Sequence, residues 1–559
     1  MDFSAVDAVL EEAVQDGVFP GAVVLVKRAG AVVYRKAHGY RSLEPEQTPL
    51  HEDIVFDLAS LTKPLATTVA LMRLVAEKKV RLDDRFSRFF PNFGTYGKAP
   101  ITVRQLLSHA SGLPAWRPYY QELRKRKRKV GQLVTLGSRS ARHFIYAQLQ
   151  REKIENEPGS CAVYSDLGFM LLGALVEDMS GIGFDQYCWE KIYRPLGMLA
   201  TGFINLEVLR QKRLEAMTEM MAPTERCPWR KRVLCGEVHD DNAYAMGGVA
   251  GHAGLFATID DVDRLVTCLV ECHAGAHTFL PAHILREFWT VDEAVPYSTW
   301  ACGWDTPSLH GSSAGELFPP DSVGHLGFTG TSIWIDLEHK IHVIMLSNRV
   351  HPRRKNDKIQ AFRPVLHNTI MQTLLEAERT APLAAVEAPA TEPEDVISSE
   401  PVPGVQDIKE EEHAAESLDT VPIPLTEVEM PTEGRAGSET EQAAEQETQK
   451  RAEMAEDASP LQAELDQPSE TSPVSPAIRT TQDNPPQTSS PRAQSQSALH
   501  PFLAGYRFRT NPEFLTDEAR DSESRPPAAD THAQLSRTQN EEDAADDTPS
   551  GDKVSSLAS

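Results

Sequence analysis

Two patterns rich in β-branched residues, one near each end of the first 380 residues, predict β-hairpins. Residues 21–28 and 31–36 are valine-rich and are joined around Gly30. Residues 332–336 and 341–346 repeat the pattern, separated by a short polar turn. Strands at both ends of one region favour an antiparallel sheet that the two ends build together.

Apolar residues at helical spacing fill the region between and before these hairpins. The segments with this spacing are residues 4–16, 56–76, 162–176 and 260–272. The predicted fold class is therefore α+β, an α/β sandwich. We expect an antiparallel β-sheet formed from both ends of the domain, flanked by helices, with an all-helical subdomain beside it.

Composition changes near residue 380. Residues 381–559 hold 37 acidic and 12 basic side chains, a net charge of −25, which equals the net charge of the whole chain. The acidity therefore belongs to this tail and says nothing about a substrate. We predict a folded domain at residues 1–378 and an acidic, Pro/Ser/Glu-rich disordered tail at residues 379–559, which is too polar to offset its ordering entropy.

Two charged or aromatic segments bear on partners. Residues 500–515 gather aromatic and apolar side chains, which indicates either a short element that binds a protein partner or a chance cluster. Residues 124–129 are six consecutive cations, but no aromatic or glycine pattern accompanies them. We therefore predict no nucleic-acid binding, and expect a solvated surface or a contact with the acidic tail.

The seven cysteines have an odd count and irregular spacing, which favours reduced thiols. Cys268, Cys272, His273 and His277 have a helix-like spacing that a metal could use. Because no second ligand pair of zinc-finger type accompanies them, the sequence predicts no metal and no other cofactor.

Neither a signal peptide nor an apolar run long enough to span a bilayer is recognisable in the numbered sequence. We expect no membrane span and a cytoplasmic location for the chain as numbered. A start further upstream would instead suit a periplasmic protein.

Candidate chemistry begins with Ser60, at the entrance of the apolar helix at residues 56–76. Lys63 follows three residues later, so the hydroxyl and the amine lie on the same face of a helix and can touch. An amine can take the serine proton if burial lowers its pKa. Free N–H groups at the helix N-terminus could stabilise an oxyanion.

Tyr164 and Asp166 lie at the start of another predicted helix. A tyrosine there can accept and return a proton if a cation, for which Lys63 is a candidate, lowers its pKa. A tyrosine packed at a helix start is the alternative. His109 and His252 are expected to be structural.

A second serine, Ser313, lies in a G-x-S-x-G pattern at residues 311–315. A nucleophile elbow needs a strand before the serine and a helix after it. Proline residues on both sides predict a loop instead, so we do not expect Ser313 to be a nucleophile.

Three stretches in this order, Ser60-Leu-Thr-Lys63, Tyr164-Ser-Asp166 and His325-Leu-Gly327, resemble the serine β-lactamase and penicillin-recognising hydrolase superfamily. The match is best with the class C branch, which includes D-Ala-D-Ala peptidases and related esterases. The resemblance implies that Ser60 is acylated, with Lys63 as its proton partner and Tyr164 as general base and later general acid.

The resemblance also implies an oxyanion hole from the backbone N–H groups of Ser60 and Phe328. Asp166, His325 and Gly327 would then bind the substrate, with residues 325–330 as the edge strand that lines it.

The middle and last motifs depart from the family pattern. Asp166 replaces the usual Asn, and Leu326 replaces a hydroxyl-bearing residue. Another register would align Ser165-Asp166 with the S-D-N motif of class A enzymes, but Leu167 then replaces the Asn. His325, where lysine is common, is only partly charged near neutral pH. These changes are expected to weaken recognition of an anionic β-lactam or a D-Ala terminus and to leave acyl transfer intact.

The sequence therefore predicts a serine hydrolase that forms an acyl-enzyme at Ser60 with an ester or amide. Ester or peptidoglycan-fragment substrates are favoured, and the choice between β-lactamase, peptidase and esterase stays open. The alternative is a non-catalytic penicillin-fold binding protein whose tail recruits partners.

Overall fold

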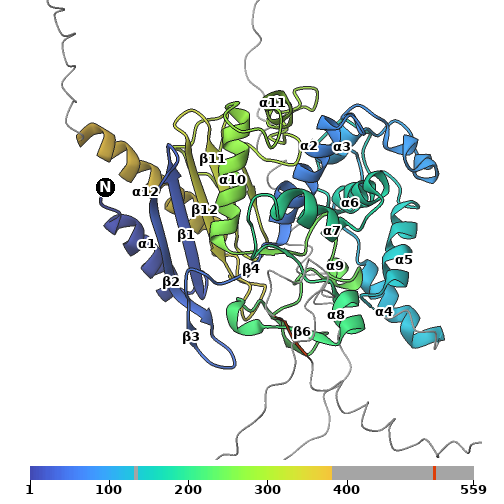
Figure 1. Ribbon diagram of the computed structural model, residues 1–559, viewed down its shortest axis with the longest axis horizontal. Helices are drawn as coiled ribbons and strands as arrows, with labels where there is room; N and C mark the ends of the chain where they lie inside the picture. Colours follow the sequence, from blue (N-terminus) through green and yellow to red (C-terminus); the bar gives the residue numbers. More distant parts are fainter. Residues whose placement is uncertain (131–135, 381–507, 511–559) are drawn as a thin grey trace, which may run out of the picture.

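A computed structural model describes residues 1–130, 136–380 and 508–510 (Figure 1). Most of the predicted tail lies outside the described residues, so its disorder and the boundary at residue 378 stay predictions. The last helix before the tail, α12 (Ile359–Thr380), ends close to that boundary.

A six-stranded antiparallel sheet is built from both ends of the domain, as predicted. Its strands, in spatial order, are β10 (Val323–Leu326), β11 (Ser332–Asp336), β12 (Ile341–Ser347), β1 (Gly21–Arg28), β2 (Ala31–Ser42) and β3 (Thr48–Pro49). The central pairing joins β1 to β12, with Val24 opposite Met345. Both predicted hairpins are present, β1 with β2 and β11 with β12.

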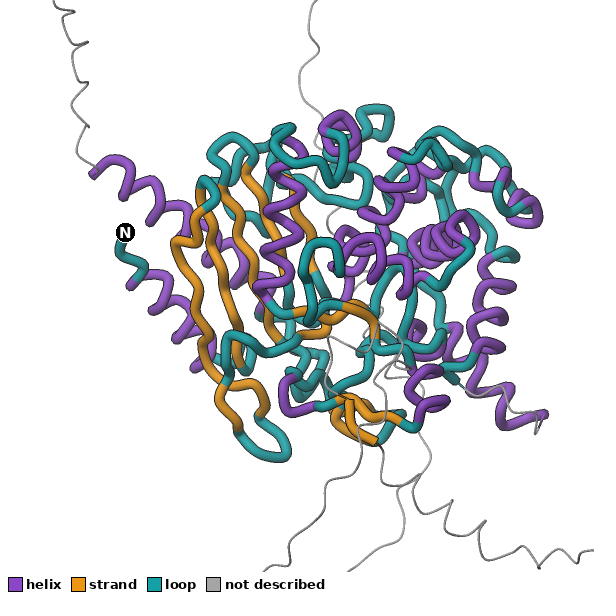
Figure 2. The backbone as a smooth tube through the Cα atoms, viewed as in Figure 1, coloured by secondary structure: helices purple, strands orange, loops and turns teal. Residues whose placement is uncertain are grey.

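Helices cover both faces of this sheet (Figure 2). Helix α10 (Ile259–His273) packs on the face that receives Val23 and Leu25. Helices α1 (Ser4–Gln15) and α12 pack on the other face, against Val24 and Val26. Successive side chains of β1 enter opposite cores, which explains why residues 22–26 are all apolar and do not alternate with polar residues.

The helical subdomain lies beside the sheet (Figure 1). Its principal helices are α2 (Val69–Ala76), α3 (Val103–Leu107), α4 (Tyr119–Val130), α5 (Arg139–Leu149), α6 (Asp166–Ser180) and α7 (Phe184–Cys188). A small sheet of β4 (Phe56–Asp57), β9 (Leu255–Ala257) and β5 (Gly202–Phe203) leads into it. Further α-helices and short strands are α8 (Leu206–Lys212), β6 (Leu214–Ala216), β7 (Arg226–Cys227), β8 (Arg232–Val233), α9 (Asp241–Ala245) and α11 (Ala282–Phe288).

The segment that carries Ser60 is not one regular α-helix, contrary to the sequence prediction. A short 3-10 turn, η1 (Ala59–Leu61), leads into a π-helical segment, η2 (Lys63–Thr68), before α2 begins. Pro64 lies in the first turn of η2 and has no N–H to donate, which favours irregular hydrogen bonding there. Such irregular turns are frequent at functional sites.

One short piece of the tail is described. Strand β13 (Phe508–Thr510) pairs antiparallel with β6, with Arg509 opposite Glu215. This part of the predicted partner-binding segment therefore contacts the chain's own folded domain. The rest of residues 500–515 lies outside the described residues, and binding of a separate protein partner stays a prediction.

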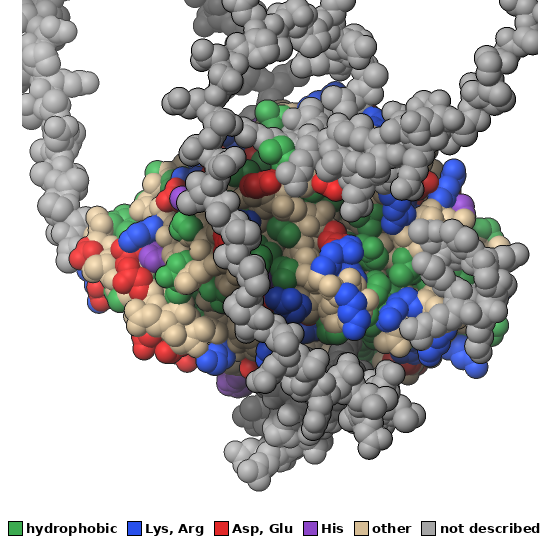
Figure 3. All heavy atoms as spheres, turned by 90° about the horizontal axis from the view of Figure 1, so that it is seen from below, with side chains coloured by type: hydrophobic (Ala, Val, Ile, Leu, Met, Phe, Trp, Pro, Cys, Tyr) green, Lys and Arg blue, Asp and Glu red, His purple; other side chains and the backbone are tan. Residues whose placement is uncertain are grey.

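Two surface properties bear on partners. On the face seen in Figure 3, apolar side chains separate the Lys and Arg side chains, which are more frequent over the right half.

In the part of the chain that the structure describes, no single helix is long and apolar enough to cross a bilayer. One bent pair, α6 with residues 184–193, meets the length and composition criteria, but α6 is largely buried in the core.

Candidate active site

Ser60 and Lys63 touch, as their spacing predicts. The Lys63 ammonium lies 3.0 Å from Ser60 Oγ and donates to it. Ser60 follows Ala59, whose backbone φ of 47° is in the left-handed region. A non-glycine residue there is strained, and the Asp57 carboxylate compensates by accepting the Ala59 N–H at 2.9 Å. The serine is thus held at a tight turn and is partly accessible to solvent.

The protonation of Lys63 differs from the prediction. Its side chain is completely buried, and burial alone would lower its pKa. However, the Asp166 carboxylate accepts a hydrogen bond from Lys63 Nζ at 2.8 Å, and this charge raises the pKa above the ordinary value. The expected lowering was wrong because a carboxylate 103 residues further along the chain compensates the ammonium. Lys63 is therefore a cation in the resting site.

Tyr164 is the third member of the site. Lys63 Nζ lies 4.7 Å from the centre of its ring, and its hydroxyl interacts with both Lys63 and Ser60. Burial raises the pKa of the phenol, and the nearby Lys63 charge only partly opposes this effect. The condition set in the sequence analysis, a pKa lowered by a cation, is therefore not met in the resting site, since desolvation outweighs the Lys63 charge. The resting tyrosine is neutral.

His109 fixes the segment that carries Tyr164. Its Nδ1 accepts the Ser165 N–H at 3.0 Å, and its carbonyl accepts the Val163 N–H at 2.9 Å. Ser165 caps helix α6 by accepting the Gly168 N–H, and donates its hydroxyl proton to the Pro114 carbonyl. His109 is therefore structural, as expected, and it also positions the tyrosine.

The turn after β10 lies against the Ser60 segment. Thr329 Oγ1 donates to the Asp57 carbonyl at 2.7 Å, and Thr331 Oγ1 donates to the Leu58 carbonyl at 3.1 Å. A Cβ at Gly327 would lie only 2.6 Å from the Leu58 carbonyl oxygen. Only glycine allows this close approach, so Gly327 helps bring the turn to Ser60.

The two proposed oxyanion donors occupy this junction. Among residues 1–130, 136–380 and 508–510, no turn, loop or cap hydrogen bond to a backbone carbonyl starts from the Ser60 N–H or the Phe328 N–H. Phe328 itself is held from both sides: its ring stacks on His239, and its carbonyl accepts from Arg349 Nε at 2.9 Å. Both N–H groups are therefore free of such an acceptor, and their role as donors to an oxyanion stays a prediction.

His325 is neutral, whereas the sequence predicted partial charge. The side chain is 2% exposed, and burial together with the Lys63 charge lowers its pKa to about 3. Nδ1 lies 2.8 Å from the Leu326 carbonyl, which can only accept, so Nδ1 carries the proton. Among the described residues the buried Nε2 has no hydrogen-bond partner, and in this tautomer it is an acceptor. This position offers no positive charge to a substrate carboxylate.

Trp300 is a site residue that the sequence analysis missed. Its ring packs against His109, Tyr164 and His325, with centroid distances of 4.5, 5.4 and 5.6 Å. It forms an aromatic wall beside Tyr164 and His325. No local motif marks this tryptophan, and only the tertiary fold brings it to the site.

Two other candidate residues have structural positions. Ser313 lies in a turn without a flanking strand or helix, so it is not in a nucleophile elbow. His252 pairs with Asp240 at 2.9 Å, and its carbonyl accepts from Lys63 Nζ at 3.3 Å. Both outcomes agree with the sequence analysis.

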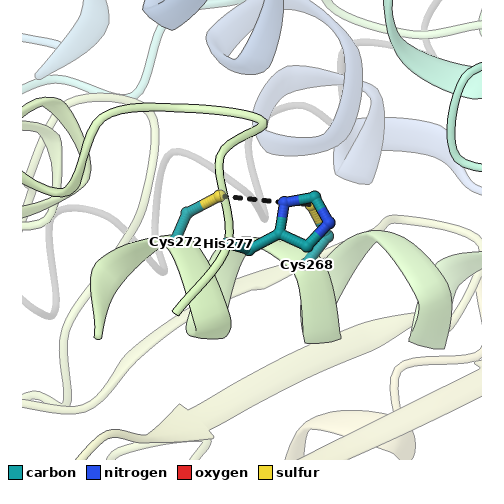
Figure 4. Close-up of side chains that lie close together, drawn as sticks. All are labelled: Cys268, Cys272 and His277. Carbon is teal, nitrogen blue, oxygen red and sulfur yellow. Dashed lines mark hydrogen bonds between the residues drawn. The ribbon is translucent and has the colours of Figure 1, made fainter. Parts of the chain in front are cut away.

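The cysteine and histidine set was predicted to hold no metal, yet three of its members lie together. In the part of the chain that the structure describes, Cys268, Cys272 and His277 form the only cluster with metal-ligating geometry (Figure 4). His273, the fourth member, instead stacks on Trp289.

A serine, a lysine one turn later, a tyrosine from a distant helix start and an edge strand beside them define the class of penicillin-recognising serine hydrolases. Residues 6–364 match the model of the Beta-lactamase family, and the chain belongs to this family. The predicted fold and enzyme class, a hydrolase, are thereby confirmed.

Relatives and a solved structure agree with this assignment. A protein of Escherichia coli (strain K12) described as "Putative D-alanyl-D-alanine carboxypeptidase" is 32% identical over 357 residues, which cover 60% of this chain and 79% of that protein. The N-acetylmuramyl-L-alanine amidase of Bacillus subtilis (strain 168) is 32% identical over 369 residues, 62% of this chain and 80% of that protein. Unliganded simvastatin synthase (LovD) from Aspergillus terreus shares the fold, with a TM-score of 0.50 at 19% identity over 67% of this chain and 99% of that one.

Proposed function

We propose that Ser60 is the nucleophile of an acyl-transfer reaction that cleaves an amide. The observation that carries this proposal is the 3.0 Å contact between Lys63 Nζ and Ser60 Oγ, with the Tyr164 hydroxyl beside both. Ser60 Oγ bonds to the acyl carbon, and the oxyanion is stabilised by the N–H groups of Ser60 and Phe328. The C–N bond then breaks as Tyr164 returns the proton to the leaving nitrogen, and water later releases the acyl group from Ser60.

The proton on Ser60 needs an acceptor, and in the resting site neither Lys63 nor Tyr164 can take it. Lys63 is held as a cation by Asp166, and Tyr164 is neutral. The reactive form is therefore the one in which the coupled Lys63 and Tyr164 pair has lost one proton. Because both pKa values are raised, this form grows as pH rises, and we propose an activity that increases into the alkaline range.

The acyl compound is proposed to be an amide of the N-acetylmuramyl-peptide type, with no carboxylate next to the scissile bond. A peptide ending in D-Ala carries a carboxylate next to the scissile bond, and the buried, neutral His325 offers that group only an acceptor nitrogen. In an N-acetylmuramyl-peptide the carboxyl group of the first alanine forms the next peptide bond, so no carboxylate lies next to the scissile amide. Of the activities named for the two relatives, the amidase activity therefore suits this site better. Ser60 would attack the carbonyl carbon of an ester in the same way, so an ester is also a chemically suitable substrate.

The test is covalent labelling followed by product analysis. A fluorophosphonate probe should label the wild type and not Ser60→Ala, with Ser313→Ala as the matched control that labels normally. The wild type should then release the peptide from an N-acetylmuramyl-peptide faster than D-Ala from a D-Ala-D-Ala peptide. Absence of labelling in a folded wild type would favour the non-catalytic binding protein. Faster release of D-Ala would contradict the proposed substrate and leave the nucleophile assigned.

A further inference from the structure

Helix α10 and the loop after it bring two thiols and an imidazole together outside the candidate active site. Cys268 and Cys272 are four residues apart on α10, so they face the same side one turn from each other. After the helix, Gly275 adopts a left-handed φ of 77°, and the Ala276 N–H bonds back to the Glu271 carbonyl at 2.8 Å. This turn folds His277 over the two cysteines (Figure 4).

The distances fit a tetrahedral metal ion. His277 Nδ1 lies 3.7 Å from Cys268 Sγ and 3.9 Å from Cys272 Sγ, and all three ligand atoms lie within 4.8 Å of one another. Zinc bonds of about 2.3 Å to sulfur and about 2.0 Å to nitrogen require a sulfur–nitrogen edge of about 3.6 Å and a sulfur–sulfur edge of about 3.8 Å. An ion therefore needs only small movements of these side chains.

The protonation pattern also fits. The Phe279 N–H donates to His277 Nδ1 at 3.0 Å, so this nitrogen holds a lone pair and the ring is in the form that ligates metals. A bound ion would displace that hydrogen bond, which is the cost of binding. The Leu280 N–H points at Cys272 Sγ at 3.4 Å, an interaction that favours a thiolate and orients it.

One side of the cluster is open. Cys268 and His277 line a cavity of about 550 Å³ together with Asp263, Thr267 and Glu271. The Asp263 carboxylate already pairs with Lys27 Nζ at 2.8 Å and with His342 Nε2 at 2.7 Å, so it is not the natural fourth ligand. The fourth coordination position therefore faces the cavity, where water or Glu271 could fill it.

We propose that Cys268, Cys272 and His277 bind one thiophilic divalent cation, Zn²⁺ in the first instance, with a fourth position open to the cavity. The ion ties the loop at residues 274–280 to α10, a helix that packs on the central sheet. Three protein ligands with an open position are typical of zinc sites that also bind a further ligand. The proposal is independent of the chemistry at Ser60.

Binding of Co²⁺ and Zn²⁺ to the full chain tests the proposal. The protein is stripped with a chelator, kept reduced with a phosphine, and titrated with Co²⁺. One ion per chain should give a thiolate-to-cobalt charge-transfer band and the intense visible bands of tetrahedral cobalt, and Zn²⁺ should abolish both. Zn²⁺ should also raise the Tm, because it binds only the folded loop. A wild type without the charge-transfer band would overturn the proposal.

Variants then check the ligand set. Cys268→Ser and His277→Gln should weaken Zn²⁺ binding by more than about 10-fold, and Cys268→Ser should also lose about half of the charge-transfer intensity. His273→Gln, on the same helix turn, and Cys235→Ser, a half-buried thiol elsewhere, should bind as the wild type does. Full intensity in Cys268→Ser, or loss of binding in His273→Gln, would overturn the assignment. Cys272→Ser is less informative because that side chain is fully buried, and circular dichroism would confirm that each variant is folded.

Discussion

The two sides of the candidate active site differ in how they handle charge. On the nucleophile side, the Lys63 ammonium is buried but compensated by Asp166, and its hydrogen bonds reach Ser60 and the His252 carbonyl. On the strand side, His325 is equally buried, neutral, and has an unpartnered Nε2. The first side is equipped to move protons, and the second has lost the cation that would select an anionic substrate. Under the proposed function, bond cleavage and substrate choice would be carried by separate elements and could change independently.

Removal of the Ser60 hydroxyl tests the nucleophile side most severely. Ser60→Ala should reduce kcat/KM by at least about 10,000-fold, because no acyl-enzyme can form. Steady-state hydrolysis and mass spectrometry of the intact protein measure rate and adduct. Ser313→Ala should retain full activity. An acyl adduct on the Ser60→Ala protein would show that another residue is the nucleophile.

Loss of the Tyr164 hydroxyl should have the next largest effect. Tyr164→Phe removes the group that exchanges the proton and should lower kcat by about 100-fold to 10,000-fold. KM should change much less, since the ring and its packing against Trp300 remain. Tyr297→Phe, a fully exposed tyrosine, is the matched control. A kcat within a few-fold of the wild type would mean that Lys63 alone manages the proton.

Neutralising Asp166 should change the pH dependence. The Asp166 charge raises the pKa values of both Lys63 and Tyr164, so Asp166→Asn should lower both. The ascending limb of the profile of kcat/KM against pH should then move to lower pH, by about one unit. A shift of that size corresponds to about 10-fold more activity on the limb at a fixed pH. An unmoved limb, or one shifted to higher pH, would show that Asp166 does not set the proton affinity of the pair.

A charge added on the strand side should have the smallest effect on catalysis and act on substrate preference. His325→Lys should raise kcat/KM for a D-Ala-D-Ala peptide relative to a neutral amide by about 10-fold, since an ammonium can pair with the terminal carboxylate. His325→Gln, which adds no charge, should leave the preference unchanged. His325→Lys could instead leave both the ratio of the two kcat/KM values and the affinity for the peptide unchanged. The terminal carboxylate would then be excluded for another reason, such as the shape of the site.

Local sequence patterns were sufficient for much of the framework. The bounds of β1 and of the β11–β12 hairpin follow from runs of β-branched residues, and α10 follows from helical spacing. The contact between Ser60 and Lys63 follows from their separation by three residues. These features depend on neighbours within one element, and a sequence displays such neighbours directly.

Properties that depend on the assembled fold could not be derived in this way. The pKa of Lys63 was predicted with the wrong sign because the direction depends on the distance to Asp166, which only tertiary packing sets. The neutrality of His325 depends on burial under Trp300 and Tyr164. The clustering of His277 with two cysteines depends on the turn at Gly275. Burial and long-range contact decide each of these cases.

The pairing of β1 with β12 has a consequence for biosynthesis. Residues 21–28 leave the ribosome more than 300 positions before their partner at residues 341–347. During that interval β1 has no partner on its β12 side, and strand pairing over such a sequence separation is intrinsically slow. The serine at position 60 is likewise synthesised long before the β10 turn that completes its surroundings. Translation must therefore pass through nearly the whole domain before the site exists, so a prematurely terminated chain would be inert.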